Sequence, residues 1–445
     1  MPHTATMQAK QDGAADNRIL IGIDAGTSVF KAAAFDARTG RVLALATRRM
    51  PIMSPQPGWI ETPAVALDRA LGSTLNSLRN SLGARWRRVC GVGIAAQGGS
   101  TIFVNRETGD ARADMVLWND TRAFQETIAI RKRKLDRWWR ERLLNDWTPA
   151  GLGRFAWFAR HQRAVFNNQD LIHVGAGEYV FHRMTGVWRQ DAGNAIQIGS
   201  YDAAKGALTN DMLRLVNFST ARVAPLRNGH ETAPLDATAA LAFRLEPNIP
   251  VAGPYIDQEA ALQSVHCVAA RPLQCSLGTA WVGNFSLRRS LVGSASMQFV
   301  LRGADAHTRT IVLPLLTGNT AWDWALSRFL GGNQREALAK ADALMTERGL
   351  PPNGMVCIPW LLQGDPIDVQ TSGACTFYGV GPTTTAHDFV RAVACGLCFE
   401  LLRVFEPLKQ RKHIDSVIIS GGASKAKGFR ALIATLFAPL PVYVQ

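Results

Sequence analysis

The stretch LIGIDAGTSVFKAAAFDARTG, residues 20–40, constrains the fold more than any other part of this sequence. Residues 19–23 are apolar and rich in β-branched side chains, so they predict a buried strand that ends next to the carboxylate of Asp24. A Gly-Thr-Ser turn leads into a second predicted strand at 31–36, and a tight turn leads into a third at 41–50. Three strands joined by tight turns, ahead of any long helix, predict an antiparallel start to a mixed sheet.

Two later segments share the pattern of an apolar strand followed by a turn of small residues. One is LQCSLGTAWVGNFSL, residues 273–287, and the other is IDSVIISGGASKAKGF, residues 414–429. The first of these repeats the strand, Gly-Thr turn and strand of the opening stretch. This repetition suggests a duplicated fold.

The chain length of 445 residues is more than one compact core usually holds, so two domains are expected. The proline-rich stretch RLEPNIPVAGPYID predicts an extended connection between them. The expected divisions are a flexible tail at 1–18, a first domain at 19–248 and a second domain at 249–445.

The composition is that of a globular protein, with 47% hydrophobic and 19% charged residues. No window holds the roughly 18 consecutive apolar residues of a membrane helix, and the polar, acid-containing start is unlike a secretory signal or a transit peptide. Seven scattered cysteines are typical of reduced thiols. Cys395 and Cys398 form a C-x-x-C pair inside a predicted buried helix, so we favour a packing role over a redox or metal role. These features predict a cytoplasmic protein without a membrane partner.

The net charge of +14 and the pI of about 9.9 raise the question of an anionic partner. The densest basic run, IRKRKLDRWWRERLL at residues 130–144, includes Trp138 and Trp139. Basic and aromatic side chains together can contact nucleic acid. They also suit an amphipathic surface helix whose basic side chains lie along apolar neighbours. We favour the surface helix and expect no nucleic-acid partner, because no recognised nucleic-acid module accompanies the run.

Glycine turns after apolar strands suit phosphate binding, because the backbone can approach a ligand closely and present its N–H groups. Three such turns occur, at residues 26–28, 278–279 and 421–423, and Lys31 adds positive charge near the first. The sequence holds neither a G-x-x-x-x-G-K-[ST] nor a G-x-G-x-x-G motif, which excludes a P-loop and the dinucleotide fingerprint.

Two acids stand next to these elements, and each has two interpretations. Phosphates repel the carboxylate of Asp24 unless a cation such as Mg²⁺ lies between them, whereas acids also simply favour turns. Asp257 precedes a predicted helix and either caps it or takes a proton from a substrate hydroxyl. On local sequence alone, the two interpretations of Asp24 are about equal, and the cap is favoured for Asp257.

Six motifs in order resemble the FGGY carbohydrate kinases, and the resemblance is strongest to the xylulokinase-like branch. They are IGIDAGTSVFKAAAFD, QPGWIETP, VLWNDTRA, VAGPYIDQEAAL, SLGTAW and ISGGASKAKGF, and the resemblance as a whole spans roughly residues 19–444. The resemblance implies an α/β protein of two actin-like, ribonuclease H-like domains. Each is expected to hold a mixed sheet of the five-stranded type, flanked by helices, with a cleft between the domains. It further implies transfer of the γ-phosphoryl group of Mg-ATP to a sugar or polyol.

The resemblance assigns expected roles to individual residues. Asp257 resembles the catalytic base, and Asp24 resembles the acid that meets the magnesium ion. The residues implied for the sugar are Gln97, Gly98, Gly99, Trp118, Asp120 and Asp257. The residues implied for ATP are Asp24, Thr27, Ser28, Lys31, Gly278, Thr279, Gly318, Gly421, Gly422 and Ala423, with Ala426 near the base.

The sequence also departs from the family. QGGS at residues 97–100 lacks the Met-His pair of xylulokinases and also the Arg-Glu pair of glycerol kinases. The substrate therefore stays open, and the candidates are a pentulose such as xylulose and a linear polyol such as erythritol. The family continues past Gln445 with a strand and an alanine-rich helix, so the second domain is expected to be incomplete. The alternatives are a truncated or degenerate homologue without activity and another actin-like ATPase, which GWIE and WND argue against. A homodimer is among the assemblies the resemblance allows.

Overall fold

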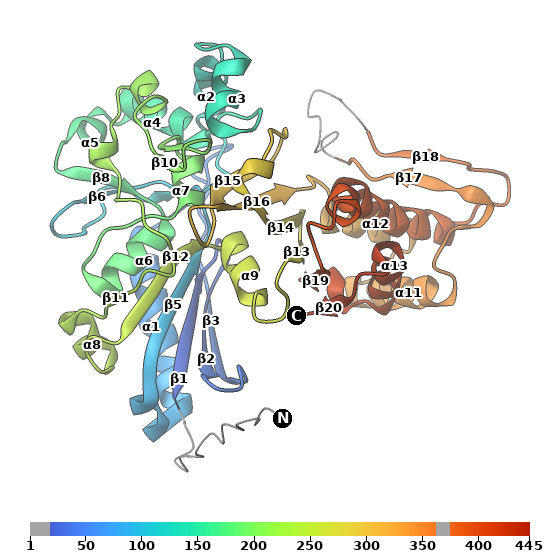
Figure 1. Ribbon diagram of the computed structural model, residues 1–445, viewed down its shortest axis with the longest axis horizontal. Coiled ribbons are helices and arrows are strands. Elements are labelled where there is room, and N and C mark those ends of the chain that lie inside the picture. Colours follow the sequence, from blue (N-terminus) through green and yellow to red (C-terminus); the bar gives the residue numbers. More distant parts are fainter. Residues whose placement is uncertain (1–17, 362–373) are drawn as a thin grey trace, which may run out of the picture.

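The computed structural model describes residues 18–361 and 374–445, so nearly all of the expected tail at 1–18 lies outside the described residues. Two α/β domains lie next to each other, the first blue to green and the second yellow to red in Figure 1. This arrangement confirms the expected fold class of two mixed sheets flanked by helices.

The first sheet has the strand order β11-β12-β5-β1-β2-β3. Strands β1, β5 and β12 run parallel to one another, and β2, β3 and β11 pair antiparallel. Every second residue of β1 is buried, which is the period expected of a strand whose one face packs on the core. The bounds are β1 (Ile19–Ala25), β2 (Val29–Asp36), β3 (Val42–Arg49), β5 (Val89–Ala96), β11 (Ala233–Pro234) and β12 (Pro250–Ile256). The predicted three-stranded antiparallel start is confirmed.

The second sheet has the order β15-β16-β14-β13-β19-β20. Its strands β13, β14 and β16 repeat the antiparallel meander of β1, β2 and β3, and β19 and β20 add parallel strands as β5 and β12 do. The predicted duplication is therefore present. Among the described residues each sheet has a sixth strand, β11 or β15, beyond the shared five. The bounds are β13 (Pro272–Leu277), β14 (Trp281–Arg288), β15 (Phe299–Arg302), β16 (Thr308–Pro314), β19 (Ser416–Ser420) and β20 (Val442–Val444).

Short strands pair outside the two main sheets. They are β4 (Glu61–Thr62) with β7 (Met115–Val116), β6 (Ile102–Asn105) with β8 (Leu171–Val174), β9 (Tyr201–Asp202) with β10 (Ala207–Leu208), and β17 (Val356–Ile358) with β18 (Thr376–Tyr378).

The helices cover the sheets and hold apolar residues at helical spacing. In α1, for example, Leu67, Leu71 and Leu78 are buried against the first sheet. The first domain contains α1 (Ala64–Leu82), α2 (Phe124–Arg131), α3 (Asp136–Leu143), α4 (Ala150–His161), α5 (Arg163–Asn167), α6 (Ala176–Thr185), α7 (Ala192–Gln197) and α8 (Ala237–Phe243). The second contains α10 (Asn319–Phe329), α11 (Gln334–Glu347), α12 (Ala386–Gln410) and α13 (Lys427–Phe437). No helix of the described residues is long and apolar enough to cross a bilayer.

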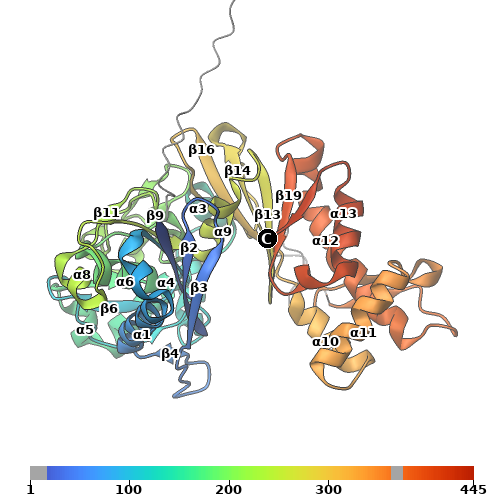
Figure 2. The same ribbon diagram turned by 90° about the horizontal axis from the view of Figure 1, so that it is seen from below.

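Helix α9 (Asp257–Val265) joins the two sheets. The helix follows β12. This strand pairs with β5 in the first sheet, although it lies just after the domain boundary expected between residues 248 and 249. The helix then contacts β13 and β14 of the second sheet, and it lies between the two sheets in Figures 1 and 2. Its first residue, Asp257, therefore lies where the two domains meet.

The basic run at 130–144 forms the end of α2, a break and α3 rather than one helix. Trp139 is fully buried and donates its indole N–H to the carbonyl of Arg131. Four of the seven cations in the run have acidic partners: Arg131 pairs with Asp136, Arg137 with Glu141, Arg140 with Asp146, and Arg142 with Asp211. These ion pairs fit the surface interpretation of the run.

Candidate active site

The parallel strands of the first sheet end together at one edge. In the sheet register Ala25 of β1 lies opposite Ala96 of β5, and Ala96 lies opposite Ile256 of β12. The residues at and just after these three strand ends are therefore neighbours, because parallel strands present their carboxyl ends at the same edge. Asp24, the turn that starts at Gln97, and Asp257 are brought together in this way.

Asp24 and Lys31 face each other across the β1–β2 hairpin. They are cross-strand partners in the register, and Lys31 Nζ lies 3.0 Å from Asp24 Oδ2. The lysine side chain is 51% exposed and the aspartate 37%, so both remain open to a ligand. The turn between them brings Gly26 close to Val29. A Cβ atom added to Gly26 would lie only 2.7 Å from the carbonyl oxygen of Val29.

A hydrogen-bond chain connects the residues expected for phosphate with those expected for sugar. The indole N–H of Trp118 donates to Thr27 Oγ1 at 3.1 Å, and that hydroxyl donates to Gln97 Oε1 at 2.8 Å. Gln97 is buried, and its Nε2 has no hydrogen-bond partner among the described residues. Trp118 is 54% exposed, so its ring presents a flat apolar surface next to that amide. Ser28 is exposed at the same turn.

The Gly98–Gly99 turn is closed from behind by α7 and α4. A Cβ atom on Gly98 would lie 2.3 Å from the Gln197 side chain and 2.9 Å from that of Ile256. Gly99 has a φ of +74°, a backbone conformation that favours glycine. The N–H of Gly99 donates to Asn194 Oδ1 at 3.1 Å. The buried guanidinium of Arg154 donates to the carbonyls of Gly99 and Trp118, and burial lowers its pKa to about 10.

Asp120 has a different environment from the one expected of a sugar contact. Its carboxylate is fully buried and receives three hydrogen bonds from the guanidinium of Arg122, at 2.8 to 3.0 Å, one from the backbone N–H of Arg122 and one from the N–H of Ile60. Arg122 also pairs with Glu61 at 2.7 Å and lies over the ring of Trp59. In this structure the carboxylate of Asp120 therefore holds the 118–122 segment in place, and its role as a sugar contact stays a prediction.

Asp257 is the first residue of α9, and its Oδ1 accepts the N–H of Gln258 at 2.8 Å. The residue at the N-cap is Ile256, and no side-chain cap bond is made there. Although Asp257 is exposed, its location between the domains removes much of its hydration, and the nearby Asp24 adds negative potential. Both effects raise the pKa of Asp257, to about 6. A carboxyl with such a pKa can accept a proton near neutral pH.

Three further acids are buried behind Asp257. They are Glu178, Asp191 and Glu259, and burial raises the pKa of each above its usual range. Repulsion adds to this effect, from Asp191 on the two glutamates and from Asp257 on Asp191. Asp191 caps α7 by accepting the N–H of Asn194 at 2.6 Å. The side chain of Ile256 packs against Gly193 of α7, so the segment that leads into Asp257 contacts the same helix as the Gly99 turn.

The glycine turns of the second domain converge on Asn319. Gly278 and Thr279 follow β13, Gly318 precedes α10, and Gly421, Gly422 and Ala423 follow β19. The N–H of Asn319 donates to the carbonyl of Gly278 at 3.1 Å, and its Nδ2 donates to the carbonyl of Leu277 at 3.2 Å. Because Ser276 of β13 lies opposite Ser420 of β19, the first and last turns share one edge of the sheet. Thr279 and Gly421 are exposed there, and their backbone N–H groups have no hydrogen-bond partner among the described residues.

A magnesium ion fits this edge only with help from phosphate oxygens. Within residues 18–361 and 374–445 no group of three or more His, Cys, Asp or Glu side chains could hold a metal ion. Mg²⁺ is commonly bound by one or two carboxylates together with waters and substrate phosphates. The half-exposed carboxylate of Asp24 suits that arrangement, and Lys31 beside it suits the phosphates.

Several residues that support the candidate site carry only weak signals in the sequence. Asp191 and Asn194 form an Asp-x-x-Asn spacing ahead of a short helix, which is a capping signal that says nothing of function. Arg154 is an ordinary arginine within a helical stretch, and Asn319 is one residue after an expected glycine. Only the folded chain shows that these side chains support the turns.

Comparisons with known proteins agree with this geometry. Residues 19–263 match the sequence model of the FGGY family of carbohydrate kinases, N-terminal domain, and residues 314–445 match that of the C-terminal domain. Human glycerol kinase 5 is 22% identical over 91% of this chain and 80% of its own length. Glycerol kinase of Methylobacterium nodulans is 28% identical over 59% of this chain and 52% of its own length.

Solved structures show the same fold. Xylulose kinase from Rhodospirillum rubrum superimposes with a TM-score of 0.82 at 21% identity, covering 94% of this chain and 84% of that one. Glycerol kinase from Plasmodium falciparum, solved with ADP, gives a TM-score of 0.80 at 16% identity, with the same two coverages of 94% and 84%.

Proposed function

Because this chain belongs to the FGGY family of carbohydrate kinases, we propose that it transfers the γ-phosphoryl group of ATP to a hydroxyl of a small sugar or polyol. The observation that carries this proposal is the shared edge of β1, β5 and β12. There the Asp24–Lys31 pair, the Gln97–Gly99 turn and Asp257 meet.

Asp257 acts as the general base. It takes the proton of the acceptor hydroxyl while the oxygen of that hydroxyl bonds to the γ-phosphorus. The bond from the γ-phosphorus to the β–γ bridging oxygen breaks at the same time, giving ADP and a sugar phosphate. The raised pKa of Asp257, about 6, leaves it ionised at pH 7 yet basic enough to bind the proton.

ATP lies along the turns of the second domain and reaches toward the first. Thr279 and Gly421 expose their backbone groups for phosphate and nucleoside, and Lys31 adds the positive charge that phosphoryl transfer needs. Asp24 would hold the Mg²⁺ ion, which when bound with ATP neutralises charge on the phosphate oxygens.

The acceptor lies over the Gln97–Gly99 turn. The unpartnered Nε2 of Gln97 is a donor for a sugar oxygen, and the exposed ring of Trp118 packs on the carbon face of the sugar. Glycines at 98 and 99 leave no side chains over the turn, which favours a pentulose such as xylulose or a linear polyol such as erythritol.

The test measures ADP release by the purified chain with Mg-ATP and a panel of pentuloses, hexuloses and polyols. Acceptor-dependent release above the rate with ATP alone is expected for at least one compound. The Asp257→Asn variant keeps the shape of the side chain and should lose about 100-fold or more in kcat, the usual contribution of a general base.

Two outcomes contradict the proposal. Equal turnover by wild type and Asp257→Asn removes the base from the scheme. A folded chain that binds ATP but shows no acceptor-dependent turnover across the panel supports instead a homologue that binds its ligands without catalysis.

A further inference from the structure

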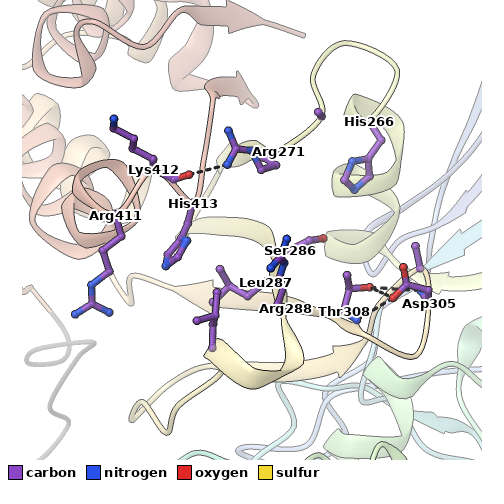
Figure 3. A pocket seen from close by; sticks show the side chains of 13 residues that line it. His266, Arg271, Ser286, Leu287, Arg288, Asp305, Thr308, Arg411, Lys412 and His413 are labelled. Atoms are coloured by element: carbon purple, nitrogen blue, oxygen red, sulfur yellow. Dashed lines mark hydrogen bonds between the residues drawn. The ribbon is translucent and has the colours of Figure 1, made fainter.

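A pocket of about 510 Å³ lies at the opposite edge of the second sheet from the glycine turns (Figure 3). Strand β14 leaves the Gly278–Thr279 turn at Trp281 and reaches the pocket at Arg288. At about 3.3 Å per residue, its length separates the pocket from the nucleotide turns by roughly 23 Å. The pocket is therefore distinct from the candidate active site.

Residues that carry cationic side chains line this pocket from three elements of the fold. Arg271 precedes β13, Arg288 ends β14, and Arg411 and Lys412 follow α12. His266, which follows α9, and His413 stand on opposite sides of the opening in Figure 3. Asp305 is the one acid among the described residues that line the pocket. The positive charge therefore outweighs the negative charge at this site.

The cations have few partners within the protein. Among the described residues, the side chains of Arg288, Arg411 and Lys412 have no ion pair or hydrogen bond. Arg271 uses Nη1 to donate to the carbonyl of Lys412 at 2.8 Å, and its distance to the carboxylate of Asp415 is 3.9 Å. Like charges gathered without counter-charges repel one another, and a bound anion removes that repulsion.

Asp305 does not neutralise these cations. Its Oδ1 accepts three hydrogen bonds at 2.8 to 3.0 Å, from the N–H groups of His307 and Thr308 and from the Thr308 hydroxyl. Figure 3 shows the carboxylate turned toward Thr308 in its own loop. The acid therefore shapes the β15–β16 loop and leaves the guanidinium groups available to a ligand.

The rest of the lining sets the kind of molecule that fits. Leu287 and Leu291 contribute apolar surface, and Ser286 contributes a hydroxyl. A volume of about 510 Å³ is within the usual range of roughly 300 to 1,000 Å³ for small-molecule sites. One arginine guanidinium group can donate two parallel hydrogen bonds to two oxygens of the same phosphate. Arginine therefore favours phosphate over anions with a single charge.

We propose that this pocket binds a small phosphorylated molecule that carries at least two anionic groups. Arg288 and Arg411 contact the anionic groups, and the leucine side chains pack on the remainder of the molecule. Inorganic pyrophosphate is the simplest probe of this chemistry, because it presents two linked phosphates without a sugar or a base.

The experiment titrates the full chain with pyrophosphate by isothermal calorimetry at low ionic strength, where exposed charges are least screened. The test variant is Arg288→Gln/Arg411→Gln, and Lys412→Gln is a second, independent variant. Arg335→Gln is the matched control, because Arg335 is exposed on α11 of the same domain and does not line the pocket. Lys31→Ala reports on pyrophosphate bound at the candidate active site instead.

We expect Arg288→Gln/Arg411→Gln to weaken pyrophosphate binding at least tenfold. We expect Lys412→Gln to weaken it by a smaller factor. Arg335→Gln and Lys31→Ala should each retain one pyrophosphate site of wild-type affinity. Melting temperatures close to that of the wild type show that the variants are folded. The proposal is overturned by wild-type binding in the double variant, by an equal loss in Arg335→Gln, by loss of all binding in Lys31→Ala, or by no binding to the wild type at millimolar pyrophosphate.

Discussion

The backbone N–H of Gly99 donates a hydrogen bond to Asn194 Oδ1 at 3.1 Å, which attaches the turn expected to contact sugar to helix α7. The same helix begins after the cap residue Asp191 and packs through Gly193 on the side chain of Ile256, the residue before Asp257. One short helix therefore contacts both the turn expected to bind sugar and the segment that leads into the proposed base.

Replacing Asn194 with Ala should weaken acceptor binding. The substitution leaves the buried N–H of Gly99 without an acceptor, which costs about 1 to 3 kcal/mol. We expect kcat/KM for the acceptor to fall about tenfold or more, while the KM for ATP stays unchanged. Steady-state kinetics with each substrate varied in turn separates the two effects. Equal losses for acceptor and ATP would mean that the variant disturbs the whole domain.

The pH dependence of turnover should report on Asp257. The base works only when ionised, and its pKa is raised to about 6, so activity is lost as the pH falls through that value. We expect log kcat/KM for the acceptor to rise with unit slope below about pH 6 and to level off above it. Measurement from pH 5 to 8 in buffers of constant ionic strength tests this. A flat profile down to pH 5 contradicts the assignment.

Gly421→Ala should impair both stability and nucleotide binding. Gly421 has a φ of +92°, and an added Cβ would lie 2.8 Å from the carbonyl oxygen of Leu277. We expect a loss of about 1 kcal/mol or more in the free energy of unfolding and a higher KM for ATP. Gly331→Ala is the matched control, because its φ is +63° and nothing lies within 4 Å of the added atom. An unchanged KM for ATP in Gly421→Ala would remove this turn from the nucleotide site.

Glu259→Gln should stabilise the protein more at high pH than at low pH. Burial and the nearby Asp191 raise the pKa of Glu259 well above 4.5. Above pH 4.5 the folded state therefore keeps a proton that the unfolded state releases. The free energy of unfolding of the wild type falls as the pH rises through this range. Glutamine has no proton to lose, so its melting temperature relative to wild type should increase from pH 5 to pH 8. Glu246→Gln, at an exposed position, is the control. A constant difference across this range contradicts the expectation.

Much of the fold follows from local sequence. The alternation of buried and exposed residues in β1, the tight turns after it and the repeat of this pattern at β13 and β14 predict the sheets. The basic run shows the limit of this approach. Its composition predicts one surface helix, but the chain breaks between α2 and α3, and Trp139 is buried with its indole N–H bonded to the carbonyl of Arg131.

The sequence by itself determined which segments form strands and where glycine turns follow them, because alternation and backbone freedom are local properties. Only the tertiary structure decided which side chains meet. It enclosed Asp120 with Arg122, placed Asn194 beneath Gly99 and set Asp257 between the two sheets. Those contacts join residues far apart in the chain, and they depend on parallel strands that align their carboxyl ends at one edge.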